Sequence, residues 1–174
     1  CHYFFSHAGF KCSGYDPRKQ DMIDANLPDV MREKFVISTR VGPYLVSHAG
    51  YTEWTLQYCK PEVEAEALKT DRAGKFHPLF GAGRARGGWQ RVGGPTWLDW
   101  NDEFEHIDDI PQIVGHTQGQ YIRSKGMTTS ESRVAPNGDI TVDIGRMSYC
   151  LDTSLRDVAW VDEDTGAVTI EQCC

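Results

Sequence analysis

Apolar and polar residues alternate along 35–41, which predicts a β-strand. The turn residues Gly42 and Pro43 follow directly, and the stretch 44–47 is again largely apolar, so a hairpin is expected here. A third strand is predicted at 112–115, after Pro111. Each of the strands 44–47 and 112–115 leads into a histidine.

The last third of the chain is also typical of β-structure. Its strands are predicted at 140–144, 148–151, 157–162 and 167–170. The hairpin signal Asn137-Gly138 precedes the first of them, and Asp164-Thr165-Gly166 separates the last two. The chain is therefore expected to end in antiparallel β-hairpins.

Helical spacing of apolar residues is confined to the first half. It predicts a helix over 19–34 after the start signal Asp16-Pro17, with a break at Pro28. A second helix is predicted at 61–68, where proline and acidic residues form the first turn. A helical turn is expected near 54–58. Together with the strands, these elements predict an α+β or α/β domain.

The segment 73–94 is predicted to be a loop, because it contains seven glycines. Three arginines, Arg84, Arg86 and Arg91, lie among them, in a protein whose net charge is −7. This local basic cluster is a candidate anion-binding segment, although an ordinary surface loop has the same composition. The Gly-x-x-x-x-Gly-Lys-Ser/Thr pattern of nucleotide-binding loops is missing.

Length and composition narrow the possible classes of protein. A chain of 174 residues with 40% hydrophobic and 25% charged residues suits one globular domain. The net charge of −7 argues against binding to a nucleic-acid duplex. Apolar runs stay well short of the roughly 20 residues of a membrane helix. The six cysteines form no Cys-x-x-Cys pair, so we expect reduced thiols and a cytoplasmic location.

Two histidines have the same local setting. His48 follows the strand 44–47 and precedes Ala49-Gly50, and His116 follows the strand 112–115. If the two strands are neighbours, both imidazoles face one point and can bind one metal ion. Each histidine taken alone is more typical of a hydrogen-bonded core or turn residue than of a metal ligand.

Three stretches together resemble the C-terminal half of a calcineurin-like metallophosphoesterase, the family of Ser/Thr protein phosphatases and diadenosine tetraphosphatases. They are Ser47-His48-Ala49-Gly50, then 112–117 after Gly94-Pro95-Thr96-Trp97, and 150–153 before a closing hairpin. The resemblance covers about residues 35–171. It implies part of a β-sandwich flanked by helices.

The resemblance also implies a site. His48 and His116 would be ligands in a centre of two divalent ions (Mn, Fe or Zn). Asp152 and Thr117 would lie next to the site without binding the ions. Two such ions activate a water for in-line attack on phosphorus. The implied activity is hydrolysis of phosphate esters or anhydrides, with a phosphorylated protein, a dinucleotide or a small ester as substrate.

The sequence departs from the family in its first half. The motifs Asp-x-His, Gly-Asp-x-x-Asp-Arg-Gly and Gly-Asn-His-Asp/Glu are missing, and the chain begins with Cys1. We therefore expect 1–174 to be a single, incomplete domain that lacks its N-terminal half and has little activity alone. Leu98-Asp99 stands where the family often has an arginine, so a phosphate-binding arginine is either supplied by Arg84, Arg86 or Arg91 or is missing.

Two other functions remain open at this point. One is a non-catalytic relative that binds a partner through the Gly/Arg loop. The other is a serine hydrolase that uses Ser47-His48 or Ser6-His7, which the missing Gly-x-Ser-x-Gly elbow disfavours.

Overall fold

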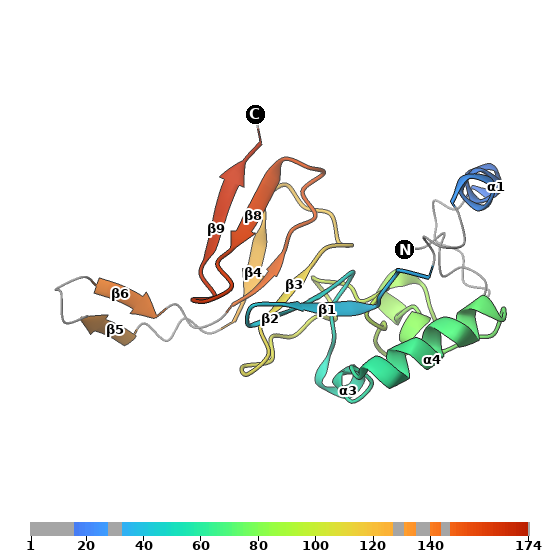
Figure 1. The fold of residues 1–174 in the computed structure, drawn as a ribbon, viewed down its shortest axis with the longest axis horizontal. Coiled ribbons are helices and arrows are strands. Elements are labelled where there is room, and N and C mark those ends of the chain that lie inside the picture. The colour runs from blue at the N-terminus through green and yellow to red at the C-terminus, as the bar shows by residue number, and fades with distance from the viewer. Residues whose placement is uncertain (1–15, 28–32, 127–130, 135–139, 144–146, 174) are drawn as a thin grey trace.

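A mixed five-stranded sheet organises the fold (Figure 1). The computed structural model describes residues 16–27, 33–126, 131–134, 140–143 and 147–173. The strand order is β1-β2-β3-β7-β4. The strands are β1 (Ser38–Val41), β2 (Tyr44–Ser47), β3 (Gln112–Val114), β7 (Ser148–Cys150) and β4 (Arg123–Lys125). The expected α+β character is confirmed.

The middle of the sheet is parallel. β2 pairs with β3 and β3 pairs with β7 in parallel, whereas β1 and β4 are antiparallel to their neighbours. The predicted β1–β2 hairpin is confirmed, but β1 begins at Ser38 and not at residue 35. Both Ile113 and Val114 are buried, as expected for a parallel strand covered on both faces. The carboxyl ends of β2, β3 and β7 therefore share one edge.

Strand β4 is not predicted from the sequence. Its residues are Arg123, Ser124 and Lys125, which show no apolar alternation. The ammonium of Lys125 donates hydrogen bonds to the carbonyls of Trp100 and Phe104, at 2.5 and 2.8 Å. It also lies 5.3 Å from the centroid of the Trp100 ring. These contacts help to hold β4 in place. They join residues that are far apart in the sequence, so the local pattern of apolar and polar residues does not predict them.

The helices lie where helical spacing predicts them, with shifted ends. They are α1 (Pro17–Asn26), α3 (Glu53–Leu56) and α4 (Pro61–Arg72), with the short 3-10 turns η1 (Pro78–Phe80) and η2 (Arg84–Arg86). Asp16 begins α1 by accepting the N–H of Arg18 at 2.9 Å. α1 ends at Asn26, before Pro28, and the second half of the predicted helix lies partly outside the described residues. In the described part of the chain, no helix has the length and apolar character to cross a bilayer.

Two hairpins complete the fold. β8 (Asp157–Val161) pairs with β9 (Val168–Gln172), which confirms the predicted closing hairpin. β5 (Glu131–Val134) pairs with β6 (Ile140–Asp143), and Figure 1 shows this pair apart from the other strands. The turn signal Asn137-Gly138 lies between β5 and β6 but outside the described residues.

Two clusters of buried side chains form the core. One joins β2 to α4 and η1, and consists of Ile37, Leu45, Tyr51, Ala67, Leu79 and Phe80. The other lies behind the ends of β2, β3 and β7, and consists of Ala49, Leu98, Trp100, Phe104, Val114 and Cys150. Leu98 and Trp100 bring the segment between β2 and β3 into this second cluster, where turns at 95–97 and 100–103 flank residues 98 and 99.

A buried carboxylate links β1 to α4. Glu64 accepts hydrogen bonds from the hydroxyls of Tyr51 and Ser38, at 2.5 and 2.6 Å, and from the Ser38 N–H at 3.3 Å. Burial, the hydrogen bond to Glu64 and the charge of Glu64 raise the pKa of Tyr51 well above its ordinary value. Tyr51 therefore stays protonated in the folded protein at a pH where a free tyrosine ionises.

This pKa shift predicts a loss of stability in alkali. Above about pH 10 the unfolded chain loses the Tyr51 proton while the folded chain keeps it. The free energy of unfolding should then fall by about 1.4 kcal/mol per pH unit through this residue. Urea unfolding of Tyr51→Phe between pH 9 and 11 should show a shallower fall than the parent. Tyr121→Phe, at an exposed tyrosine, is the control and should keep the parent slope.

Candidate functional site

The structure brings His48 and His116 together. β2 and β3 are parallel neighbours with Val46 opposite Ile113, and each histidine follows its strand. The Gly115 N–H donates to the His48 carbonyl at 2.9 Å, which continues the pairing past the strand ends. His48 Nε2 lies 3.2 Å from His116 Nδ1. The two predicted ligands therefore meet at the carboxyl edge of the sheet.

The separation of the two nitrogens suits a shared metal ion. In a tetrahedral site with metal–nitrogen bonds of about 2.0–2.1 Å, two donors lie about 3.3 Å apart. The observed 3.2 Å matches this value and also matches a hydrogen bond between the rings. Within the described residues, no group of three or more His, Cys, Asp or Glu side chains is placed to hold a metal ion. The pair can thus fill two ligand positions but not a complete dinuclear site.

The backbone at His116 has an uncommon conformation. Its φ is 67°, in the left-handed region that non-glycine residues seldom adopt. The Thr117 N–H donates to the Gly115 carbonyl at 2.8 Å, so a tight turn surrounds the histidine. The ring of Trp97 packs edge-on against the His116 ring, with 5.7 Å between the two ring centroids. The turn and this ring contact together aim the imidazole toward His48.

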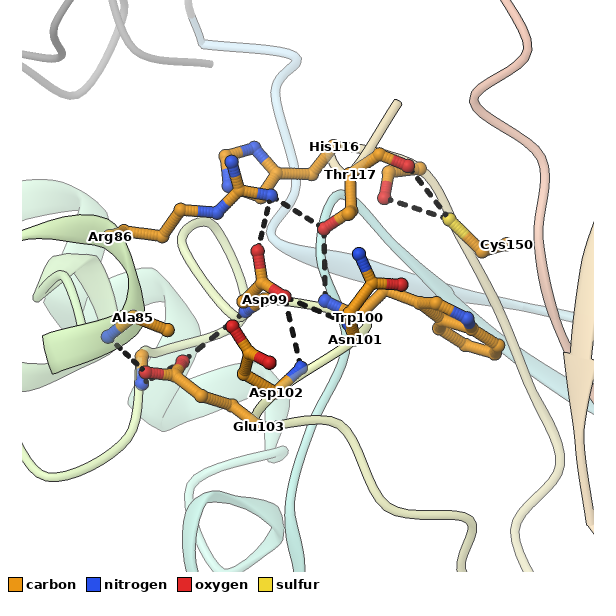
Figure 2. Close-up of polar contacts among 12 residues, drawn as sticks. Ala85, Arg86, Asp99, Trp100, Asn101, Asp102, Glu103, His116, Thr117 and Cys150 are labelled. Atoms are coloured by element: carbon orange, nitrogen blue, oxygen red, sulfur yellow. Dashed lines mark hydrogen bonds and ion pairs between the residues drawn. The ribbon is translucent and has the colours of Figure 1, made fainter. Parts of the chain in front are cut away.

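Arg86 connects the Gly/Arg loop to this turn. Its Nη2 lies 2.7 Å from Asp99 Oδ2 and donates to Thr117 Oγ1 at 2.7 Å. The Trp100 N–H also donates to Thr117 Oγ1, at 2.9 Å. Figure 2 shows Arg86, Asp99 and Thr117 converging beside His116. One arginine of the three is therefore anchored to the residue that follows the second histidine.

Asp99 was not identified from the sequence as a site residue. Its Oδ1 accepts the N–H groups of Asn101 and Asp102, at 2.8 and 3.1 Å, while Oδ2 faces Arg86. The side chain is nearly buried, with 9% exposed. Asp99 binds an arginine from another loop, Arg86. The feature of the sequence that could have identified Asp99 is an acidic residue two positions after Trp97.

Arg84 and Arg91 lie elsewhere. Arg84 is exposed on η2, and Arg91 lines a separate cavity beside Trp89. The three arginines therefore do not converge on one anion. The loop that carries them is nonetheless held in place, because Glu103 accepts hydrogen bonds from its backbone.

Glu103 joins three segments of backbone. It accepts N–H groups from Ala85 at 3.1 Å, Gly93 at 2.9 Å and Asp99 at 3.2 Å. Gly83 packs so closely that a Cβ at this position would clash with the carboxylate. Figure 2 shows Glu103 below the Arg86–Asp99 pair. Through Asp99, this carboxylate also supports the anchor of Arg86.

Asp152 follows β7 at the same edge of the sheet. Its carbonyl accepts the Gly119 N–H at 2.8 Å, so the end of β7 lies against the turn that contains His116 and Thr117. A second cation, Arg123, was missed by sequence reasoning. It donates to the Thr117 carbonyl, to Asn101 Oδ1 at 3.3 Å and to Cys150 Sγ at 3.2 Å. Burial raises the pKa of the Cys150 thiol, which favours a structural role for this cysteine.

The structure gives no support to a serine nucleophile at residue 47. The Ser47 hydroxyl has no protein hydrogen-bond partner among the described residues, so it is not activated by His48. The described serine–histidine contact is between Ser148 and His106, at 2.9 Å. Ser148 is fully buried and accepts the Gln112 N–H, which fits a structural role. Ser6 and His7 lie outside the described residues.

Comparison with known proteins adds no family to this geometry. The chain matches no protein-family model, no curated protein and no solved structure.

Proposed function

We propose that this chain supplies the histidine side of a metal centre that hydrolyses phosphate esters or anhydrides. The observation that carries the proposal is the 3.2 Å separation of His48 Nε2 and His116 Nδ1. Both lie at the carboxyl ends of neighbouring parallel strands, where open α/β sheets commonly bind ligands. The three motifs that resemble calcineurin-like metallophosphoesterases meet at this edge.

The residues have separate roles in this proposal. His48 and His116 hold one divalent ion (Mn, Fe or Zn) through neutral imidazole nitrogens. Such an ion, when bound, polarises a phosphoryl oxygen and lowers the pKa of bound water. Thr117 positions His116 through its bond to Arg86, and Arg86 places a positive charge beside the substrate phosphate. The further ligands of a dinuclear centre would come from outside the described residues.

Loss of either histidine should weaken metal binding. Removing a residue that merely supports a ligand costs about 10–100-fold in metal affinity, so removing a ligand should cost at least as much. Calorimetric titration of the chain with Mn²⁺ and with Zn²⁺ should show this loss in His48→Ala and in His116→Ala. His77→Asn is the control, since His77 begins η1 and lies outside the pair. Parent-like affinity in either alanine variant would contradict the assignment.

The hydrolytic part of the proposal needs a separate assay. Hydrolysis of an aryl phosphate with Mn²⁺ is measured for residues 1–174 and for a longer chain that includes any residues encoded before Cys1. We expect little activity from 1–174 and activity from the longer chain if it carries Asp-x-His and Gly-Asn-His motifs. Metal binding without hydrolysis in both chains would favour the alternative, a non-catalytic relative that binds a partner.

A further inference from the structure

The cavity beside Trp89 and Arg91 lies away from the histidines. It has a volume of about 690 Å³ and is bordered by the start of α3, by η1 and by segments 89–92 and 103–105. This volume lies within the range of about 300–1,000 Å³ that is usual for ligand pockets. Neither histidine of the pair lines this cavity, and neither does Arg86.

Two tryptophans that line the cavity are exposed. Trp54 is 52% exposed and Trp89 is 66% exposed, and both line the same cavity. Each ring is supported by another aromatic ring. Trp54 lies 5.9 Å from Tyr58 at an interplanar angle of 77°, and Trp89 lies 5.0 Å from Phe76 at 50°. Both indole rings are therefore exposed to solvent and held in position by a neighbouring aromatic ring.

The charged residues around these rings are mainly acidic. Glu53, Glu103 and Glu105 line the cavity together with one cation, Arg91. The Glu103 carboxylate is occupied by backbone N–H groups, whereas Glu53 and Glu105 are exposed. A cavity lined by both carboxylates and indole rings favours a cationic ligand over an anionic one. The net charge of −7 acts in the same direction.

We propose that this cavity binds an arginine side chain presented by a peptide segment of a partner protein. A guanidinium can stack on an indole ring and bind a carboxylate with two parallel hydrogen bonds. Trp54 and Trp89 supply the ring faces, and Glu53 and Glu105 supply the carboxylates. This site goes beyond the proposed hydrolytic function and does not depend on it.

A pair of short peptides tests the charge requirement. Acetylated and amidated Gly-Arg-Gly is titrated into the whole chain by calorimetry, beside the same peptide with citrulline in place of arginine. Citrulline keeps the shape of arginine but is neutral. We expect the arginine peptide to bind about 5–30-fold more tightly, because the neutral analogue loses the cation–π and charge-assisted contacts. Equal affinity for the two peptides, or no measurable binding, would overturn the proposal.

Substitutions locate the site and fix the sign of the ligand's charge. Trp89→Ala and Glu105→Gln should each weaken binding of the arginine peptide by about three- to tenfold. Arg91→Gln should tighten it by about two- to threefold, since this change removes the one cation among the lining residues. Weaker binding of the arginine peptide in Arg91→Gln would refute the assignment, because loss of a neighbouring positive charge should favour a cationic ligand.

Matched variants outside the cavity serve as controls. Trp160→Ala removes a tryptophan on β8 that is 60% exposed, and Arg84→Gln removes an exposed arginine from the same loop as Arg91. Both should bind the peptide as the parent does, and an equal loss in Trp160→Ala would also overturn the proposal. Thermal unfolding of each variant separates loss of binding from loss of fold. Glu105→Gln keeps the test decisive if Trp89→Ala fails to fold.

Discussion

Replacement of Arg86 with methionine is expected to lower the free energy of unfolding by about 2–4 kcal/mol. Methionine keeps much of the side-chain length but removes both contacts of Nη2, those to Asp99 and to Thr117. The Asp99 carboxylate, with 9% of its side chain exposed, then remains charged and nearly buried without its cation. Urea unfolding at neutral pH and low salt measures the change.

Two further variants separate the ion pair from general effects of the loop. Arg84→Met changes an exposed arginine on the same short turn and should alter stability by less than about 0.5 kcal/mol. The double variant Arg86→Met/Asp99→Asn removes the stranded charge while an amide oxygen can still accept the N–H groups of Asn101 and Asp102. It should be more stable than Arg86→Met alone. If the double variant is less stable, the cost does not come from an uncompensated Asp99.

Replacement of Glu103 with alanine is expected to cost about 2–3 kcal/mol, because three backbone N–H groups lose a charged acceptor. The same change should loosen the Gly/Arg loop. Hydrogen exchange at the amides of Ala85 and Gly93 should therefore accelerate, and urea unfolding gives the free energy.

The neighbouring acidic residue provides the control for Glu103. Glu105→Ala removes an exposed carboxylate for which no backbone hydrogen bond is seen in the described part of the chain, and it should stay within about 0.5 kcal/mol of the parent. Glu103→Gln should fall between the parent and the alanine variant, because an amide has one acceptor oxygen where the carboxylate has two. Equal stability of Glu103→Ala and Glu105→Ala would contradict the role given to Glu103.

Local pattern was sufficient for most of the elements. The hairpin of β1 and β2 was predicted because turn residues separate two strand-like stretches, and α4 was predicted because Pro61 and acidic residues mark its start. Boundaries were less accurate where tertiary contacts decide them. β1 starts three residues later than its alternation suggests, at the point where Ser38 meets Glu64.

The candidate site was only partly predictable. The shared setting of His48 and His116 anticipated their meeting, since strands that end in the same kind of turn can place side chains at one edge. The choice of Arg86 over Arg84 and Arg91 could not be made from the sequence. It depends on Asp99, which lies in a different loop, and on the fold that brings the two loops together. Arg123 was missed for the same reason, because its partner Thr117 lies in the turn after β3 and its partner Cys150 lies on β7.

The position of β7 in the sheet has a consequence for how the protein is made. β4 precedes β7 in the chain, yet β7 lies between β3 and β4. During synthesis, β3 and β4 are made before residues 148–150, so the strand that pairs with both of them is still missing. The turn of His116 and Thr117 therefore lacks its contact with Cys150 until residues 148–150 have been made. We expect His48 and His116 to reach their final positions late in folding. Pairing of β7 with β3 and β4 joins residues far apart in the sequence, and such pairing is slow.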